Sequence, residues 1–204
     1  MSQGCRIAVF ASGNGSNFQA LLEASREGGL GGGEIVLLVC DKPNAFVVER
    51  ARQAGVETYL FRPKEYARRE DYEAEIAARL TELEIDLVIL AGYMRLLTPV
   101  LVSPYAGRML NIHPSLLPAF PGTDAIGQAW NYGVKVTGVT VHLVDEGMDT
   151  GTIVAQEAVT VEPGEDVDSL TARIHQVEQR LYPQVVKQFA KGRVRVNGRK
   201  VELG

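Results

Sequence analysis

Short apolar segments alternate with longer segments of helical spacing through the first half of this 204-residue sequence. The apolar segments are rich in strand-forming residues, and the segments between them place apolar side chains three or four positions apart. We therefore predict strands at residues 6–11, 34–40, 57–61, 87–90 and 109–112, and helices at residues 17–27, 46–54 and 64–83. Strand–helix–strand repeats of this kind form a parallel sheet with right-handed crossovers and helices on both faces.

The pattern changes after Pro114, where two strand candidates follow each other with no helix between them. Such strands predict antiparallel additions to the sheet. A last helix is interrupted or kinked at Pro183, and Asn197-Gly198 between β-prone residues predicts a hairpin. The expected elements are strands at 136–144 and 152–161, a helix at 168–191 and a hairpin at 194–201. The fold class is α/β, with a Rossmann-like, mixed and mostly parallel sheet and antiparallel strands in the C-terminal half.

Composition limits the class of protein. Lys and Arg number 21 against 25 Asp and Glu, a net charge of −4, which makes nucleic acid a poor partner. The longest apolar run, residues 87–93, contains Gly92 and is too short to cross a membrane. Two cysteines, Cys5 and Cys40, cannot form a disulfide framework, and we interpret both as apolar fillers. Because no secretory pattern is present, the sequence predicts a cytoplasmic protein.

A glycine-rich turn, SGNGSN at residues 12–17, joins the first predicted strand to the first predicted helix. At this point of an open α/β sheet, the backbone N–H groups at a helix start bind anions, and Gly13 and Gly15 allow a close approach. The dinucleotide pattern G-x-G-x-x-G is broken, because Phe18 stands where the third glycine belongs. We predict a site for a terminal phosphate. The alternative is a tight turn with a capping side chain.

A second candidate site follows the fifth predicted strand, in the sequence NIHPSLLPAFPG at residues 111–122. Asn111 and His113 are two positions apart on a strand, so both point to the same side. Three prolines then restrict the path of the loop. Histidine exchanges a proton near neutral pH, and asparagine donates a hydrogen bond to a developing oxyanion. We predict a catalytic role for the pair. The alternative is a histidine that caps local carbonyl groups.

Three acidic residues share a loop with two glycines between the two late strands: Asp145, Glu146 and Asp149. The spacing does not match a calcium-binding EF-hand. One of the acids could instead pair with His113, and the alternative is a solvated acidic turn. We interpret His142 and His175 as structural. The sequence lacks the G-x-S-x-G turn of serine hydrolases and the paired motifs of zinc sites, so it predicts no metal.

Together these motifs resemble those of the phosphoribosylglycinamide formyltransferases, the folate-dependent enzymes of purine biosynthesis. The similarity covers residues 5–192 and rests on GNGSN at 13–17, MRLL at 94–97, NIHPSLLP at 111–118 and the acidic loop at 145–151. The N-x-H-P-S-L-L-P motif marks the wider formyltransferase fold, and the G-N-G-S-N loop marks the member whose acceptor carries a phosphate. The resemblance implies direct transfer of a formyl group from 10-formyltetrahydrofolate to the amine of glycinamide ribonucleotide, without a metal.

The resemblance also implies a role for individual residues. Those that would hold the phosphate and ribose of the ribonucleotide are Gly15, Ser16, Asn17 and Glu178. Those that would contact the folate are Arg69, Met94, Arg95, Leu96, Leu97, Asn111, Val144 and Asp145, with the loop at 144–149 closing over the pterin ring. Those that would carry catalysis are Asn111, His113 and Asp149.

The implied organisation is one formyltransferase domain over residues 1–204. It comprises a phosphate-binding α/β half at 1–110, a catalytic and folate-binding half at 111–192 and a C-terminal hairpin at 193–204. The expected partners are the two small molecules, with no nucleic acid and no membrane. The sequence does not decide between a monomer and a homodimer.

Four alternatives remain at this level. A methionyl-tRNA formyltransferase shares the N-x-H-P-S-L-L-P motif but needs a further domain and a basic surface. A 10-formyltetrahydrofolate hydrolase has no reason to bind a phosphorylated acceptor. A nucleotide-binding module would leave Asn111 and His113 without a role. A dehydrogenase needs the third glycine that the turn lacks.

Overall fold

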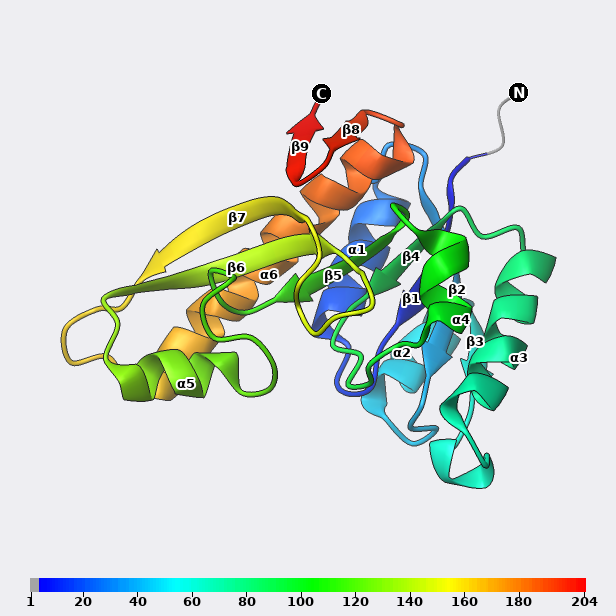
Figure 1. The fold of residues 1–204 in the computed structure, drawn as a ribbon, viewed down its shortest axis with the longest axis horizontal. Helices are drawn as coiled ribbons and strands as arrows, with labels where there is room; N and C mark the ends of the chain where they lie inside the picture. Colours follow the sequence, from blue (N-terminus) through cyan, green and yellow to red (C-terminus); the bar gives the residue numbers. More distant parts are fainter. Residues whose placement is uncertain (1–3) are drawn as a thin grey trace.

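The computed structural model describes residues 4–204 as a seven-stranded sheet flanked by helices, with a small two-stranded sheet near the C-terminus (Figure 1). The strands are β1 (Arg6–Phe10), β2 (Glu34–Cys40), β3 (Glu57–Leu60), β4 (Leu87–Leu90), β5 (Met109–His113), β6 (Val136–Leu143), β7 (Ile153–Thr160), β8 (Val194–Asn197) and β9 (Lys200–Leu203). The helices are α1 (Ser16–Arg26), α2 (Phe46–Ala54), α3 (Arg69–Glu82), α4 (Pro99–Val102), α5 (Ala125–Tyr132) and α6 (Val167–Ala190), with short 3₁₀ helices η1 (Pro63–Glu65) and η2 (Ser103–Tyr105). Residues 1–3 of the predicted domain lie outside the described residues.

The large sheet has the strand order β3-β2-β1-β4-β5-β6-β7. Strands β1 to β5 run parallel, whereas β6 is antiparallel to β5 and β7 is antiparallel to β6. The predicted mixed and mostly parallel sheet is therefore confirmed. The chain leaves β1 toward β2 and β3 and then returns to the other side of β1 through β4. Ligands of open α/β sheets bind at the carboxyl ends of the strands where the order reverses in this way.

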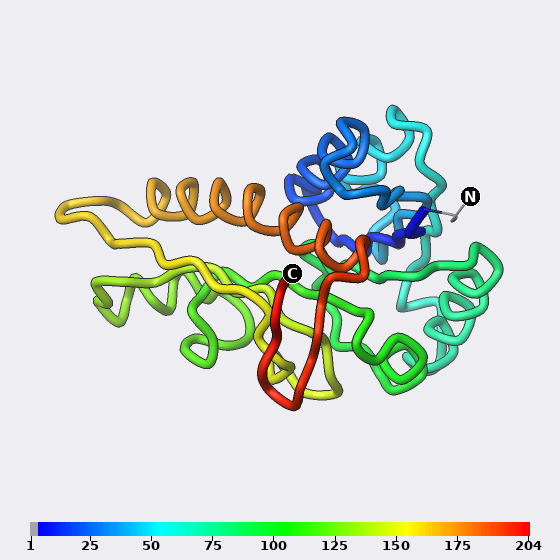
Figure 2. The backbone as a smooth tube through the Cα atoms, turned by 90° about the horizontal axis from the view of Figure 1, so that it is seen from above, coloured from blue at the N-terminus to red at the C-terminus, as the bar shows by residue number. Residues whose placement is uncertain are grey.

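The sheet separates two hydrophobic cores. Successive side chains of a strand point to opposite faces, and on β1 Ile7 and Val9 pack with α1, α2 and α6, while Ala8 and Phe10 pack with α3 and α4. Figure 2 shows α1, α2 and α6 on one side of the sheet and α3 and α4 on the other. Helices on both faces, as predicted, are confirmed.

Helix α6 ties the two halves of the chain together. Its Tyr182 is fully buried, and the hydroxyl group lies 2.8 Å from the Leu90 carbonyl of β4 and 3.1 Å from the Leu110 carbonyl of β5. This contact fixes α6 against the middle of the sheet. Glu178, one turn earlier on the same helix, is thereby placed beside the carboxyl ends of the strands.

The predicted helix over residues 64–83 is wrong at its start. Residues Pro63–Glu65 form the 3₁₀ helix η1, and α3 begins only at Arg69. The reason is a local cap: Arg68 is extended, and its backbone N–H donates to the Asp71 carboxylate at 3.1 Å. A carboxylate at the third helical position satisfies an N–H group that the first turn leaves without a partner.

Helix α6 continues through Pro183 and is not interrupted there. Burial of neighbours such as Tyr182 and Val185 outweighs the missing N–H group of the proline. The C-terminal hairpin is confirmed, but its two-residue loop is Gly198-Arg199, one residue later than the predicted Asn197-Gly198.

Helix α5 was not predicted. Gly127 lowers the helix propensity of this short segment. The Asp124 side chain accepts the Gly127 N–H at 3.3 Å as an N-cap, and Gly133 ends the helix in the left-handed conformation with φ +80°. An aspartate before the helix and a glycine after it are the signals that could have identified it.

Candidate active site

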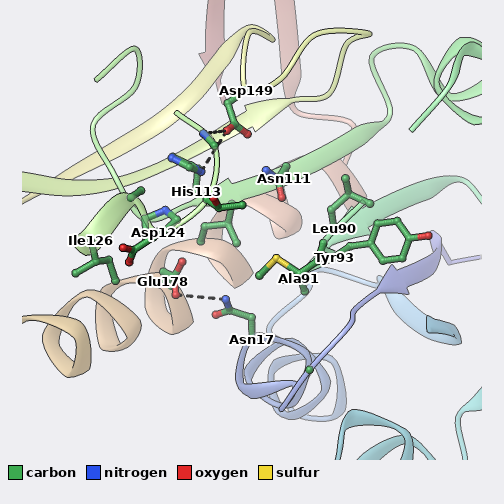
Figure 3. Close-up of a pocket in the computed structure, with 18 of the residues that line it drawn as sticks. Asn17, Leu90, Ala91, Tyr93, Asn111, His113, Asp124, Ile126, Asp149 and Glu178 are labelled. Atoms are coloured by element: carbon green, nitrogen blue, oxygen red, sulfur yellow. Dashed lines mark hydrogen bonds and ion pairs between the residues drawn. The ribbon is translucent and has the colours of Figure 1, made fainter. Parts of the chain in front are cut away.

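A cavity of about 600 Å³ opens where β1, β4 and β5 end (Figure 3). The turn after β1, the segment after β4, the end of β5, the loop between β6 and β7 and one face of α6 line it. All predicted site residues except Arg69 are part of this lining: Gly15, Ser16, Asn17, Met94, Arg95, Leu96, Leu97, Asn111, His113, Val144, Asp145, Asp149 and Glu178. Residues far apart in the sequence meet because the carboxyl ends of parallel strands share one edge of the sheet.

The turn after β1 places the start of α1 at the cavity, and no side chain caps this helix start. Gly15 is the N-cap of α1 with φ +80°, and a Cβ atom there would lie 2.5 Å from Val47 Cγ2. The N–H groups of the first turn have no intrahelical partner. Arg50 steadies the turn from outside, because its Nε donates to the Asn14 carbonyl at 2.9 Å. The alternative of a capping side chain is not found, and the arrangement suits an anion.

Asn17 and Glu178 lie side by side in the cavity wall and point toward each other (Figure 3). Asn17 Nδ2 donates to Glu178 Oε2 at 3.5 Å, while Asn17 Oδ1 is buried and has no hydrogen-bond partner among residues 4–204. His175 Nε2 lies 4.0 Å from Glu178 Oε2. Burial raises the pKa of the Glu178 carboxyl to about 7, and the hydrogen bond from Asn17 opposes the rise. Two acceptor groups side by side suit a ligand that offers hydroxyl donors.

The pH dependence of the free energy of unfolding should reflect the protonation of the Glu178 carboxyl. The unfolded carboxyl loses its proton near its ordinary pKa of 4.5 and the folded one near 7, so between these values the folded state binds the additional proton. Stability from this group is therefore lost as the pH rises. From about pH 4.5 to about pH 8 we expect the free energy of unfolding to fall by about 3 kcal/mol relative to that of Glu178→Gln. Urea denaturation of both proteins measures this difference, and parallel curves would contradict the raised pKa.

The segment between β4 and α4 lies along the cavity without regular secondary structure. Within residues 4–204, its residues 94–97 make no backbone–backbone hydrogen bond. The Met94 N–H donates to Ser12 Oγ at 3.0 Å, and the Arg69 guanidinium donates to the Leu96 carbonyl at 3.0 Å. Arg69 thus contacts this segment but does not line the cavity. The remaining backbone groups of the segment are available to a flat heterocycle with donors and acceptors at its edge.

Arg95 is held by a buried carboxylate. Its Nε donates to Asp41 Oδ2 at 2.6 Å, and Ser12 Oγ donates to Asp41 Oδ1 at 2.6 Å. Asp41 is 4% exposed and both of its oxygens are occupied, so it is not available to the ribose hydroxyls of NAD. A dehydrogenase needs a free acidic residue for this ribose contact. The dehydrogenase alternative therefore lacks that residue as well as the third glycine.

Asn111 lies opposite His142 across the antiparallel pair β5–β6. Asn111 Nδ2 is 3.1 Å from His142 Nε2, and His142 Nδ1 is 2.9 Å from the Leu143 carbonyl. A carbonyl only accepts, so Nδ1 carries the proton and Nε2 accepts from the Asn111 amide. Burial lowers the pKa of His142, against smaller opposing effects of the Leu143 carbonyl and Asp149, which fits a neutral ring. The pairing orients the Asn111 amide and leaves its second N–H group for a ligand.

His113 lies between the Phe120 carbonyl and the Asp149 carboxylate, and Figure 3 shows the second of these acceptors. Its Nε2 is 2.8 Å from the Phe120 carbonyl, and its Nδ1 is 3.6 Å from Asp149 Oδ2. The carbonyl contact expected of a structural histidine is thus present together with the predicted carboxylate. Asp149 has φ +55°, its Oδ2 accepts the Gly122 N–H at 2.7 Å, and its Oδ1 lies 3.7 Å from His142 Nε2. Asp149 therefore contacts both histidine rings, and it is not part of a solvated acidic turn.

A buried polar network fixes the loop after His113. Thr140 Oγ1 donates to the Ser115 carbonyl at 2.7 Å and accepts from the Leu117 N–H and from Gln156 Nε2, each at 3.0 Å. Thr140 belongs to β6 and Gln156 to β7. The antiparallel strands therefore hold the loop in place as much as its prolines do.

Two histidines and one aspartate are among the cavity residues that were not predicted as site residues. His142 and His175 line the cavity, although the sequence analysis assigned structural roles to them, and Asp124 lines it as well. The place of His142 follows from the register of β6 against β5, for which the sequence carries no local signal.

The described residues contain neither a metal-binding cluster nor a membrane-spanning helix. Residues 4–204 contain no group of three or more His, Cys, Asp or Glu side chains placed to hold a metal ion. No helix in the same range is long and apolar enough to cross a membrane.

Comparisons with known proteins show the family of this chain. Residues 5–186 match the family described as formyl transferase. A phosphoribosylglycinamide formyltransferase of Bacillus subtilis is 49% identical over 184 residues, which are 90% of this chain and 94% of the relative. The one from Escherichia coli is 41% identical over 191 residues, 94% of this chain and 90% of the relative.

A solved structure of glycinamide ribonucleotide transformylase 1 from Symbiobacterium toebii has a TM-score of 0.95 and 44% identity, covering 100% of this chain and 95% of that one. The transformylase 1 from Geobacillus kaustophilus has a TM-score of 0.89 and 53% identity, covering 92% of this chain and 99% of that one. The chain therefore belongs to the formyl transferase family. The relatives named here are its phosphoribosylglycinamide formyltransferases, so the resemblance drawn from the motifs is confirmed.

Proposed function

We propose that this formyltransferase transfers the formyl group of 10-formyltetrahydrofolate to the amine of glycinamide ribonucleotide, giving formylglycinamide ribonucleotide and tetrahydrofolate. One observation carries the proposal. A single cavity joins a helix start suited to an anion, a backbone segment suited to a heterocycle and the cluster of Asn111, His113 and Asp149. The Bacillus subtilis and Escherichia coli relatives are named for formyl transfer to phosphoribosylglycinamide.

Each substrate has its own part of the cavity in this proposal. The ribonucleotide phosphate lies at Gly15, Ser16 and Asn17, with the ribose hydroxyls at Glu178. The folate lies along Met94, Arg95, Leu96 and Leu97 and near Asn111, Val144 and Asp145, while Arg69 acts through Leu96. The division at residues 1–110, 111–192 and 193–204 remains a prediction from the sequence. The cytoplasmic location, the homodimer and the absence of nucleic-acid partners remain predictions from the sequence.

The chemistry follows from the residues at the end of β5. The neutral amine attacks the formyl carbon, and an oxyanion forms on the tetrahedral intermediate. The second N–H group of Asn111 donates to this oxyanion, and the positive charge of a protonated His113 nearby stabilises it. A proton then moves from the new ammonium to the departing folate nitrogen. Because Asp149 lies beside Nδ1 of His113, it keeps the ring oriented and balances its charge.

Asp149→Asn tests the role of this carboxylate. Asparagine also adopts the left-handed conformation and keeps an oxygen for the Gly122 N–H, so the variant removes the charge and leaves the loop in place. We expect kcat to fall at least about tenfold. Exposed Asp168→Asn, on α6, is the matched control. Steady-state kinetics at saturating substrates measure kcat, and an unchanged value would remove Asp149 from the mechanism.

The formyl-transfer assay tests the proposal as a whole. Purified protein is incubated with 10-formyltetrahydrofolate in the presence and absence of glycinamide ribonucleotide, and tetrahydrofolate formation is recorded. We expect turnover only with the ribonucleotide, and little with the matching riboside that lacks the phosphate. Equal release of tetrahydrofolate without the ribonucleotide would support the hydrolase alternative instead.

A further inference from the structure

The segment at residues 94–97 is fixed by side chains from other parts of the fold. Met94 is 71% exposed and Leu96 is 47% exposed, so apolar burial contributes little to holding these two residues. Ser12 accepts the Met94 N–H, and Arg69 donates to the Leu96 carbonyl. Apart from the packing of Leu97 against the core, the shape of this segment therefore depends on polar anchors outside the cavity.

The next anchor along the chain is Glu73, in the second turn of α3. Its side chain is 0% exposed, and its two oxygens accept the Thr98 N–H at 3.1 and 3.0 Å and also the Thr98 hydroxyl. Thr98 is the N-cap of α4 and directly follows the segment. Among residues 4–204, Glu73 takes part in no ion pair.

Helix capping alone does not explain a buried carboxylate at this position. The Thr98 hydroxyl already accepts the Val100 N–H at 3.3 Å, as an N-cap does. Burial also raises the pKa of the Glu73 carboxyl, and the hydrogen bonds from Thr98 oppose the rise. A buried charge that one residue alone satisfies stabilises a fold less than a well-packed apolar side chain would. What Glu73 does provide is a second rigid support for the end of segment 94–97.

We propose that Glu73 is a positioning residue for the formyl donor, because through Thr98 it fixes the backbone of residues 94–97 that the pterin ring contacts. This inference rests on the proposed function, in which the folate lies along that segment. Neither Glu73 nor Thr98 lines the cavity, so both act through the segment and not on the ligand. A segment held in its bound shape loses less conformational entropy when the donor binds.

The test separates the two substrates. Glu73→Ala should raise the KM for 10-formyltetrahydrofolate roughly tenfold, because hydrogen bonds to a charged group are lost. The KM for glycinamide ribonucleotide should change less than about twofold, because its site lies at α1 and α6. Glu73→Gln keeps the shape and an acceptor for Thr98, so it should restore the donor KM to within about threefold of the wild type.

Three further variants make the comparison specific. Thr98→Val removes the hydroxyl bond to Glu73 but keeps the backbone N–H, so it should raise the donor KM less than Glu73→Ala does. The double variant with Glu73→Ala should raise the donor KM by less than the product of the two single effects, since the two substitutions share the hydroxyl bond. The matched control is Glu70→Ala, an exposed glutamate on the same helix, which should leave all constants unchanged.

Several outcomes would overturn the inference. They are equal increases in KM for both substrates, a loss confined to kcat, or failure of Glu73→Gln to restore the donor KM. If Glu73→Ala does not fold, Thr98→Val decides, and an unchanged donor KM in that variant contradicts the role. If the wild-type protein transfers no formyl group, the proposed function fails. Calorimetry with a non-reactive folate analogue on the same variants then still decides the role of Glu73.

Discussion

Asn111→Ala should lower kcat by roughly 100- to 1000-fold, while the KM values of the two substrates change far less. The loss of one preorganised donor to an oxyanion has an effect of this size, because the donor acts mainly in the transition state. Neighbouring groups orient the Asn111 side chain for this role. Its amide is oriented by His142, a direct neighbour across the β5–β6 pair, and its second N–H group is left for the reacting oxygen.

Steady-state kinetics and thermal denaturation together check this prediction. The matched control is Asn131→Ala, an exposed asparagine of α5, which should leave kcat within about twofold, as surface substitutions do. If Asn111→Ala raises the donor KM strongly and leaves kcat intact, Asn111 binds the folate and does not stabilise the intermediate. That result would contradict the mechanism.

Gly15→Val should weaken the binding of glycinamide ribonucleotide by roughly 100-fold or more, and the binding of a folate analogue by less than about threefold. The glycine has φ +80°, and the first atom of any side chain there would lie 2.5 Å from Val47 Cγ2. The helix start must therefore shift or the side chain must fill the place of the phosphate. The folate site uses other residues and should remain intact.

Gly55→Val is the control that separates backbone strain from damage to the site. Gly55 also has a positive φ of +72°, it has open space around its Cβ position, and it lies outside the cavity at the end of α2. It should lower the free energy of unfolding but leave both affinities unchanged. Calorimetry gives both binding constants for both variants. Equal losses of ribonucleotide and folate binding in Gly15→Val would contradict a separate phosphate site.

The parallel half of the fold could be predicted because its signals are local. Residues 35–40 form a continuous apolar run after Gly33 and Glu34 and before turn residues, and residues 46–54 end at Gly55. Both elements, 34–40 and 46–54, have the predicted bounds. The two-residue spacing of Asn111 and His113 also sufficed to place both side chains in one cavity.

The parts that could not be predicted depend on contacts between distant residues. His142 reaches Asn111 only through the register of two antiparallel strands. Glu178 is 161 residues from Asn17, so no local pattern connects them, and only the family resemblance pointed to it. α6 passes through Pro183 because packing against the sheet outweighs a missing hydrogen bond. Tertiary contacts of this kind override local propensity.

Tracing the formyl carbon tests the central claim most directly. The protein is incubated with 10-formyltetrahydrofolate labelled with ¹³C in the formyl group, together with glycinamide ribonucleotide and an excess of unlabelled formate, and the products are followed by ¹³C NMR. Direct transfer in one cavity predicts that all of the label enters formylglycinamide ribonucleotide, in equal amount to the tetrahydrofolate formed. Label in free formate, or tetrahydrofolate formed without the labelled ribonucleotide product, would contradict the account.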